Sequence, residues 1–157
     1  MNSFEILKSW EISIKDSHGK YELGAGSDNF EDIEDLKPTF SFDYISLEHK
    51  TFGFTGRLLG CGDYKKLLKS LKKISTYTYK VLNEEYNFHF HEIKWEDVTL
   101  PKSDFYKCIY GEKYNNEDDI TPYQFKVYDK ARIIGFVYRG VFYMVMFDRG
   151  HNAYKRK

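Results

Sequence analysis

The sequence has no long apolar run and few cysteines, and both absences exclude classes of protein. No stretch of the 157 residues approaches the roughly 18–20 apolar residues that cross a bilayer. The first five residues lack the charged and apolar regions of a secretory signal. The two cysteines, Cys61 and Cys108, stand far apart, so we expect reduced thiols and no disulfide framework. These absences predict a soluble, cytoplasmic protein.

Several motifs that carry well-defined chemistry are also missing. The segment 52–62 holds four glycines but no Gly-Lys-Ser/Thr ending, so it is not a phosphate-binding P-loop. No Ser/His/Asp, Cys/His or paired-carboxylate arrangement stands out, and the chain has no repeats or low-complexity segments. We therefore expect neither a common hydrolase layout nor a cofactor.

Charge is present but unevenly distributed over what reads as a single domain, residues 1–157. The segment 1–36 carries nine acidic residues against three lysines, a net charge of −6, so the neutral chain carries +6 over residues 37–157. An acidic N-terminal segment on a basic body fits a nucleic-acid-binding body, or simply a solvated acidic loop. The sequence leaves both interpretations open.

Helical periodicity is clearest in residues 63–85. Leu67, Leu71 and Ile74 repeat at helical spacing, and Asp63 suits the N-cap position. The outer face of this amphipathic helix carries six lysines, among them Lys69 and Lys73. Such a face could contact RNA, although charged outer faces of helices are common.

Alternating patterns predict strands around this helix. We expect them at residues 39–45, 88–95, 105–109, 123–128, 131–139 and 141–148, with further strand segments within 4–23 and a short helix at 30–37. The last three strands are joined by tight connections at Asp129-Lys130 and Arg139-Gly140. The sequence thus predicts an α+β fold, with one long amphipathic helix packed on an antiparallel sheet and a C-terminal three-stranded meander.

The residues that follow the last strand are the strongest functional candidates. Asp148, Arg149, His151 and Tyr154 place an acid, a guanidinium, an imidazole and a phenol within a few residues of each other. Cleavage of RNA by its own 2′-hydroxyl needs a base, a cation on the phosphate and an acid at the leaving oxygen. The alternative is structural, with Asp148 and Arg149 forming an ion pair and Tyr154 packing the terminus.

Two basic residues could join this group. Arg132 begins one strand of the meander and Lys126 lies on the strand before it. Because the start of one antiparallel strand lies beside the end of the next, we expect Arg132 near Asp148. Lys126, Arg132 and Arg149 would then suit a phosphate, or would simply be surface charges on a sheet.

His89 and His91 have the spacing of one strand face. With Cys61 and Cys108 they suggest zinc, but no acid–histidine motif completes a ligand set, so we expect no metal. His91 is a candidate RNA contact. Two partly buried strand histidines are the structural alternative.

The second half resembles a loosely defined group of small bacterial proteins. The resemblance lies in Phe40-Ser41-Phe42-Asp43-Tyr44, in the helix with Leu71 and Ser75, and in Phe147-Asp148-Arg149-Gly150-His151 with Tyr154. The order of a helix followed by an antiparallel meander is also similar to RelE-type endoribonuclease toxins. That similarity implies metal-independent mRNA cleavage and neutralisation by an antitoxin.

Three functional hypotheses follow from the sequence. The first is an RNA-cleaving toxin-like or phage-defence protein that uses metal-independent acid–base chemistry. The second is a non-catalytic protein-binding factor, such as an immunity protein, an antitoxin partner or a phage accessory protein. The third is a nucleic-acid-binding module that uses the lysine face.

Overall fold

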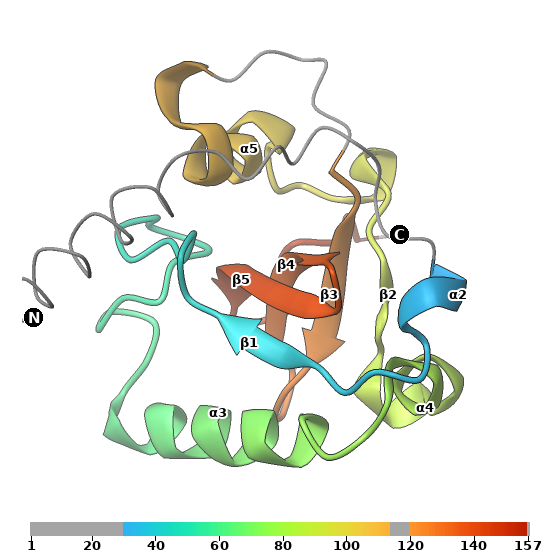
Figure 1. Cartoon of the computed structure of the whole chain (residues 1–157). Coiled ribbons are helices and arrows are strands. Elements are labelled where there is room, and N and C mark those ends of the chain that lie inside the picture. Colours follow the sequence, from blue (N-terminus) through green and yellow to red (C-terminus); the bar gives the residue numbers. More distant parts are fainter. Residues whose placement is uncertain (1–29, 114–119, 157) are drawn as a thin grey trace, which may run out of the picture.

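A five-stranded mixed sheet forms the centre of the computed structural model, which describes residues 30–113 and 120–156 (Figure 1). The strand order is β1-β5-β4-β3-β2. The strands are β1 (Thr39–Ser41), β2 (His91–Glu92), β3 (Pro122–Lys126), β4 (Arg132–Tyr138) and β5 (Val141–Asp148). The α+β class predicted from the sequence is confirmed.

The sheet is mixed because β1 pairs with β5, a strand far away in the sequence. β3, β4 and β5 pair antiparallel in succession, whereas β1 pairs parallel with β5, with Phe40 opposite Phe142. A wholly antiparallel sheet was therefore the wrong expectation. The β4–β5 connection has positive φ angles of 50° at Arg139 and 78° at Gly140, as expected for the primed turns that match strand twist.

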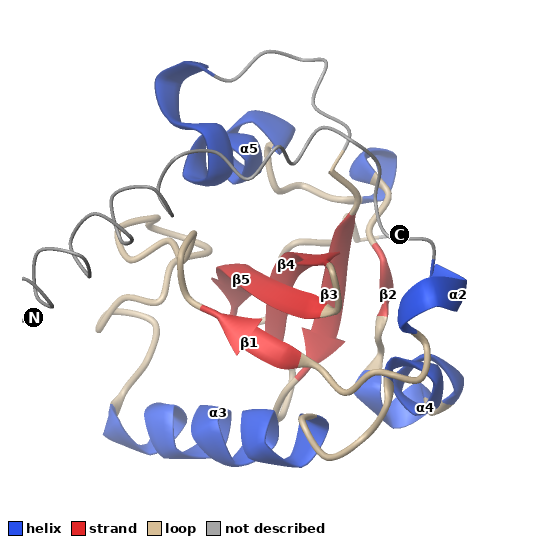
Figure 2. Cartoon of the chain, in the orientation of Figure 1, coloured by secondary structure: helices blue, strands red, loops and turns tan. Residues whose placement is uncertain are grey.

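Helices cover both faces of the sheet (Figure 2). On one face lie α2 (Phe30–Ile33), α3 (Cys61–Ile74) and α4 (Tyr79–Glu84), and on the other lies α5 (Lys102–Tyr110). The apolar residues of α3 and α4 pack with Phe125, Phe142 and Phe147 in one core. Those of α5 pack with Ile134 and Met146 in the second core. Alternate residues of the central strands thus face opposite cores.

The helix predicted at 63–85 is two helices. α3 ends at Ile74, and α4 begins at Tyr79 after Thr78, whose hydroxyl accepts a hydrogen bond from the Val81 amide at 3.4 Å. Between them, the hydroxyls of Ser75 and Thr76 donate to carbonyls three residues back. These polar side chains offer the backbone alternative partners and so favour a break. α3 also begins earlier than expected, with Gly60 as N-cap.

Three predicted strands differ from the structure. Residues 105–109 lie within α5, because Phe105, Tyr106 and Ile109 fit one helix face as well as a strand. The segment 88–95 contains only the two-residue β2, between 3-10 turns at Tyr86–Phe88 and Trp95–Asp97. The strand expected at 39–45 is confined to β1, Thr39–Ser41. The elements expected within residues 4–23 lie outside the described residues.

Within residues 30–113 and 120–156, no helix combines the length and apolarity required to cross a membrane. The cysteines Cys61 and Cys108 are both free.

Candidate functional site

Two rows of side chains cross the second face of the sheet near the end of β5. One row is Lys126, Arg132 and Asp148, and the next is His91, Gln124, Ile134 and Met146. Residues opposite each other in antiparallel strands point to the same face. The expected proximity of Arg132 and Asp148 is therefore confirmed, and Lys126 lies beside Arg132.

Asp148 fixes the chain that follows β5. Its side chain is 1% exposed, and its two carboxylate oxygens accept hydrogen bonds from the amides of Asn152 and Ala153, both at 2.8 Å. The tail then pairs with another segment, since Val98 and Tyr154 form an antiparallel bridge. Asp148 thus has a positioning role and holds the segment that carries His151 and Tyr154.

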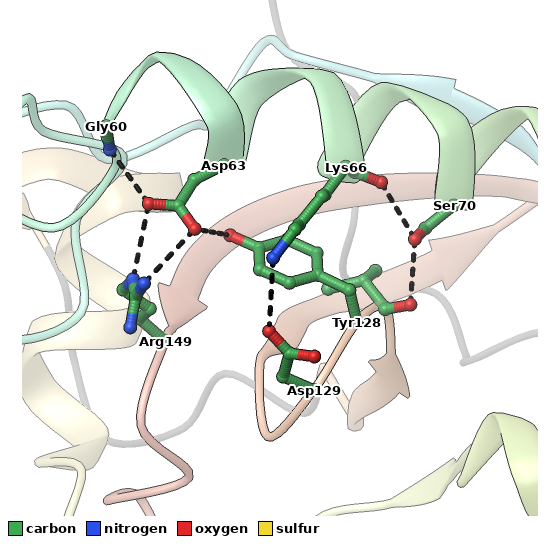
Figure 3. Close-up of polar contacts among 8 residues, drawn as sticks. Gly60, Asp63, Lys66, Ser70, Tyr128, Asp129 and Arg149 are labelled. Atoms are coloured by element: carbon green, nitrogen blue, oxygen red, sulfur yellow. Dashed lines mark hydrogen bonds and ion pairs between the residues drawn. The ribbon is translucent and has the colours of Figure 1, made fainter.

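The Arg149 side chain contacts the start of α3 and not the residues around Asp148. Its Nε and Nη2 atoms donate to the two carboxylate oxygens of Asp63 at 3.4 and 3.2 Å (Figure 3). Asp63 also accepts hydrogen bonds from the Gly60 amide and the Tyr128 hydroxyl. These bonds, led by that from Gly60, lower the pKa of Asp63. Arg149 therefore joins the tail to the start of α3, in neither a phosphate patch with Arg132 nor an ion pair with Asp148.

The side chains that do gather form what we call the histidine cluster. Its members come from β2, β3, β4, the tail and the turn before β2: His89, His91, Gln124, Arg132, His151 and Tyr154. The ring of Tyr154 lies 5.5 Å from that of His151 and 6.3 Å from that of His91, between centroids. Arg132 acts electrostatically on His89, His151 and Tyr154.

The cluster contains buried polar atoms without partners. In the described part of the chain, four such side-chain atoms occur, and three of them are Arg132 Nε, Gln124 Oε1 and Tyr154 Oη. Arg132 is 5% exposed and Gln124 is 2% exposed. A buried polar atom without a partner costs about 1–3 kcal/mol. Three in one place are a concentration that calls for a ligand or a function.

Burial sets the protonation of the titratable groups here. Desolvation, reinforced by the charge of Arg132, lowers the pKa of both His89 and His151. Desolvation also raises the pKa of Tyr154 to about 12. At neutral pH the cluster thus offers neutral imidazoles as proton acceptors and a phenol as a proton donor.

The ring of His91 is held at both nitrogens. Nδ1 lies 2.8 Å from the Glu92 carbonyl oxygen, which can only accept, so Nδ1 carries a proton. Nε2 lies 2.9 Å from Gln124 Nε2, which donates to it when His91 is neutral. Gln124 and the Glu92 carbonyl together fix the orientation of the His91 ring.

A separate cavity brings together two of the lysines singled out in the sequence. It has a volume of about 350 Å³, and Lys73 of α3 and Lys126 of β3 both line it. The ammonium of Lys73 lies 5.8 Å from the centroid of the Phe88 ring. Lys69 lies one turn earlier on the exposed face of α3.

Sequence reasoning missed Gln124 and placed His89 on the wrong element. Gln124 gave a weak signal, as an amide within the otherwise apolar strand Tyr123–Phe125. His89 was expected on a strand with His91, but it follows a 3-10 turn with a φ of 45°. Among residues 30–113 and 120–156, no three His, Cys, Asp or Glu side chains are grouped so as to hold a metal ion.

Comparison with known proteins gives no relative: no family model, curated protein or solved structure matches this chain.

Proposed function

We propose that the histidine cluster binds an RNA phosphodiester and cleaves it without a metal, as expected of a toxin-like or phage-defence endoribonuclease. The observation that carries the proposal is the set of buried, unpartnered atoms of Arg132, Gln124 and Tyr154 beside three imidazoles. Arg132 Nε and the Tyr154 hydroxyl are donors from which an anion can accept, whereas Gln124 Oε1 is an acceptor, so we assign Gln124 to holding His91 and not to the anion.

The chemistry follows from the protonation states. His151 is exposed, and its lowered pKa keeps its imidazole neutral at pH 7, so it can take the proton of a 2′-hydroxyl. The 2′-oxygen then bonds to phosphorus, and the bond from phosphorus to the 5′-oxygen breaks. The leaving oxygen takes the proton of the Tyr154 phenol. His151 then passes the proton that it took from the 2′-hydroxyl to the Tyr154 phenolate.

Arg132 supplies positive potential beneath the phosphate. Its Nη1 donates to the carbonyls of Lys130 and Ala131, which fixes the guanidinium. Lys126 beside it adds a second, half-buried cation. Fixed positive charge near the developing dianion stabilises the transition state more than mobile solvent does.

The test is cleavage of single-stranded RNA by the purified full chain in the presence of EDTA. We expect products with a 2′,3′-cyclic phosphate and a 5′-hydroxyl, and no cleavage of matched DNA, which lacks the nucleophile. His151→Asn should lower the rate at least 10²-fold. His49→Asn is the matched control, since His49 pairs with Asp104 elsewhere.

Two results would overturn the proposal: no cleavage by the wild-type chain, or equal cleavage by wild type and His151→Asn. Binding of a protein from the host without RNA cleavage would instead favour the non-catalytic partner hypothesis.

A further inference from the structure

We propose that the cavity between α3, α4 and the end of β3 binds a guanine base of the RNA. This inference rests on the proposed function, because it assigns a base-binding site to the same substrate. The cavity's volume of about 350 Å³ is near the lower end of the roughly 300–1,000 Å³ typical of small-ligand sites. Its lining includes cationic, aromatic, carboxylate and amide side chains, all of which can contact a nucleotide: Lys73, Tyr77, Glu85, Asn87, Phe88 and Lys126.

Aromatic rings supply the surface for the base. Tyr77 and Phe88 are both half-buried, and their ring centroids lie 5.1 Å apart at an interplanar angle of 55°. RNA-binding proteins recognise unstacked bases by stacking them on such rings. Ser70 does not compete for the base, because its hydroxyl is bonded to the carbonyls of Lys66 and Val127.

Glu85 selects among the four bases. An ionised carboxylate only accepts hydrogen bonds, and it can accept two in parallel. Guanine carries two adjacent donors, N1–H and the N2 amino group, on its Watson–Crick edge. Adenine, cytosine and uracil each pair a donor with acceptors on that edge. A carboxylate in the cavity lining therefore favours guanine, and the nearby Asn87 amide can bond the guanine O6.

Lys126 connects the cavity to the histidine cluster. It lines the cavity, it lies opposite Arg132 in the sheet, and its charge contributes to the lowered pKa of His89. Lys73 lines the same cavity, and we assign both cations to the phosphate of a bound guanine nucleotide. The phosphodiester presented to the histidine cluster would then be one next to guanine.

The experiment measures the binding of single nucleoside monophosphates to the full chain by calorimetry. We expect guanosine monophosphate to bind at least tenfold more tightly than the adenosine, cytidine and uridine monophosphates. Glu85→Gln should remove that preference, whereas Glu84→Gln, at the exposed end of α4, should retain it. Lys73→Ala should weaken all four nucleotides by a similar factor, and Lys72→Ala should not.

Equal affinity for the four nucleotides, or an unchanged preference in Glu85→Gln, would overturn the guanine assignment. No detectable binding of any nucleotide would overturn the site itself. Because these measurements involve no cleavage, they separate a failure of the base site from a failure of the proposed catalysis.

Discussion

At the scale of single residues, the histidine cluster holds polar atoms that cost the fold stability. Tyr154 Oη, Gln124 Oε1 and Arg132 Nε are buried without partners, while Asp148 nearby satisfies both carboxylate oxygens. Asp148 holds the tail in place, and the proposed function assigns the unpartnered donors to a ligand. Functional sites commonly retain such local costs because the rest of the fold offsets them.

The Tyr154 hydroxyl should therefore be unfavourable for folding and favourable for function. Replacing Tyr154 with Phe removes a buried polar atom that has no partner, so we expect the free energy of unfolding to rise by about 1 kcal/mol. RNA cleavage should fall at least tenfold. Urea denaturation and the cleavage assay measure the two effects on the same protein.

Tyr79→Phe is the matched control for this prediction. The Tyr79 hydroxyl donates to the Gly140 carbonyl at 2.8 Å, so its removal should lower the free energy of unfolding by about 1 kcal/mol. Destabilisation of both variants to the same extent would show that the Tyr154 hydroxyl has a partner in the folded protein.

How far single residues could be predicted depends on how local their partners are. Arg132 and Asp148 were expected to be close because a tight turn fixes which ends of β4 and β5 meet. The partner of Arg149 is Asp63, 86 residues earlier, and no local pattern relates the two. The role of Gln124 depends on an unpartnered atom, which only the packed structure reveals.

At the scale of elements, strands were predicted correctly where alternating apolar and polar residues were bounded by tight turns. A short apolar run without such turns did not distinguish a strand from a helix. β3, β4 and β5 match the three expected strands within two residues at each end. α5 was missed because a run of five residues fits both the helical and the strand period. The break between α3 and α4 depends on long-range bonds as well, since the Tyr79 and Lys80 amides donate to the carbonyls of Leu36 and Glu34.

Replacing either of two glycines in these elements with alanine should change the free energy of unfolding, but in opposite directions. At Gly135, beside the irregularity in the β4–β5 pairing, an added Cβ would lie 2.0 Å from the Tyr143 carbonyl oxygen. The added methyl group would require the paired strand backbone to move, which is energetically costly. We therefore expect Gly135→Ala to lower the free energy of unfolding by roughly 2–4 kcal/mol.

Gly62 in α3 is the counterpart, because a Cβ there meets nothing within 4 Å. Gly62→Ala should raise the free energy of unfolding by about 0.5–1 kcal/mol. Thermal denaturation of both variants checks the pair. If Gly135→Ala does not fold, Gly62→Ala still tests the prediction, and a lowered stability there would contradict it.

At the scale of the whole molecule, the fold places charge and apolar packing on the same sheet face. The second core lies under α5, and the histidine cluster continues its rows at the end of β3 and the start of β4. This arrangement depends on the tail returning to pair with residues near Val98. Such a return, like the parallel pairing of β1 with β5, joins distant segments, so sequence periodicity does not indicate it.

The histidine cluster should make the stability of the molecule depend on pH and on anions together. His89 and His151 have folded pKa values below the ordinary value of 6.5, so the unfolded chain binds more protons as pH falls. Stability is therefore fully present above about pH 6.5 and is lost as pH falls through the folded pKa values. A bound anion favours the protonated imidazoles, so by linkage it binds more tightly at low pH.

We accordingly expect sulfate to raise the melting temperature more at pH 5.5 than at pH 8, relative to chloride at equal ionic strength. Sulfate keeps its charge over this range, so the difference reports the protein's own groups. Its general stabilisation of folded proteins acts on any compact state and needs no particular imidazole. In His151→Asn, the sulfate-induced increase in melting temperature should therefore differ much less between pH 5.5 and pH 8, while the increase common to both pH values should remain. His49→Asn should behave as wild type. An equal increase at both pH values in the wild-type chain would show that no anion site is coupled to these histidines.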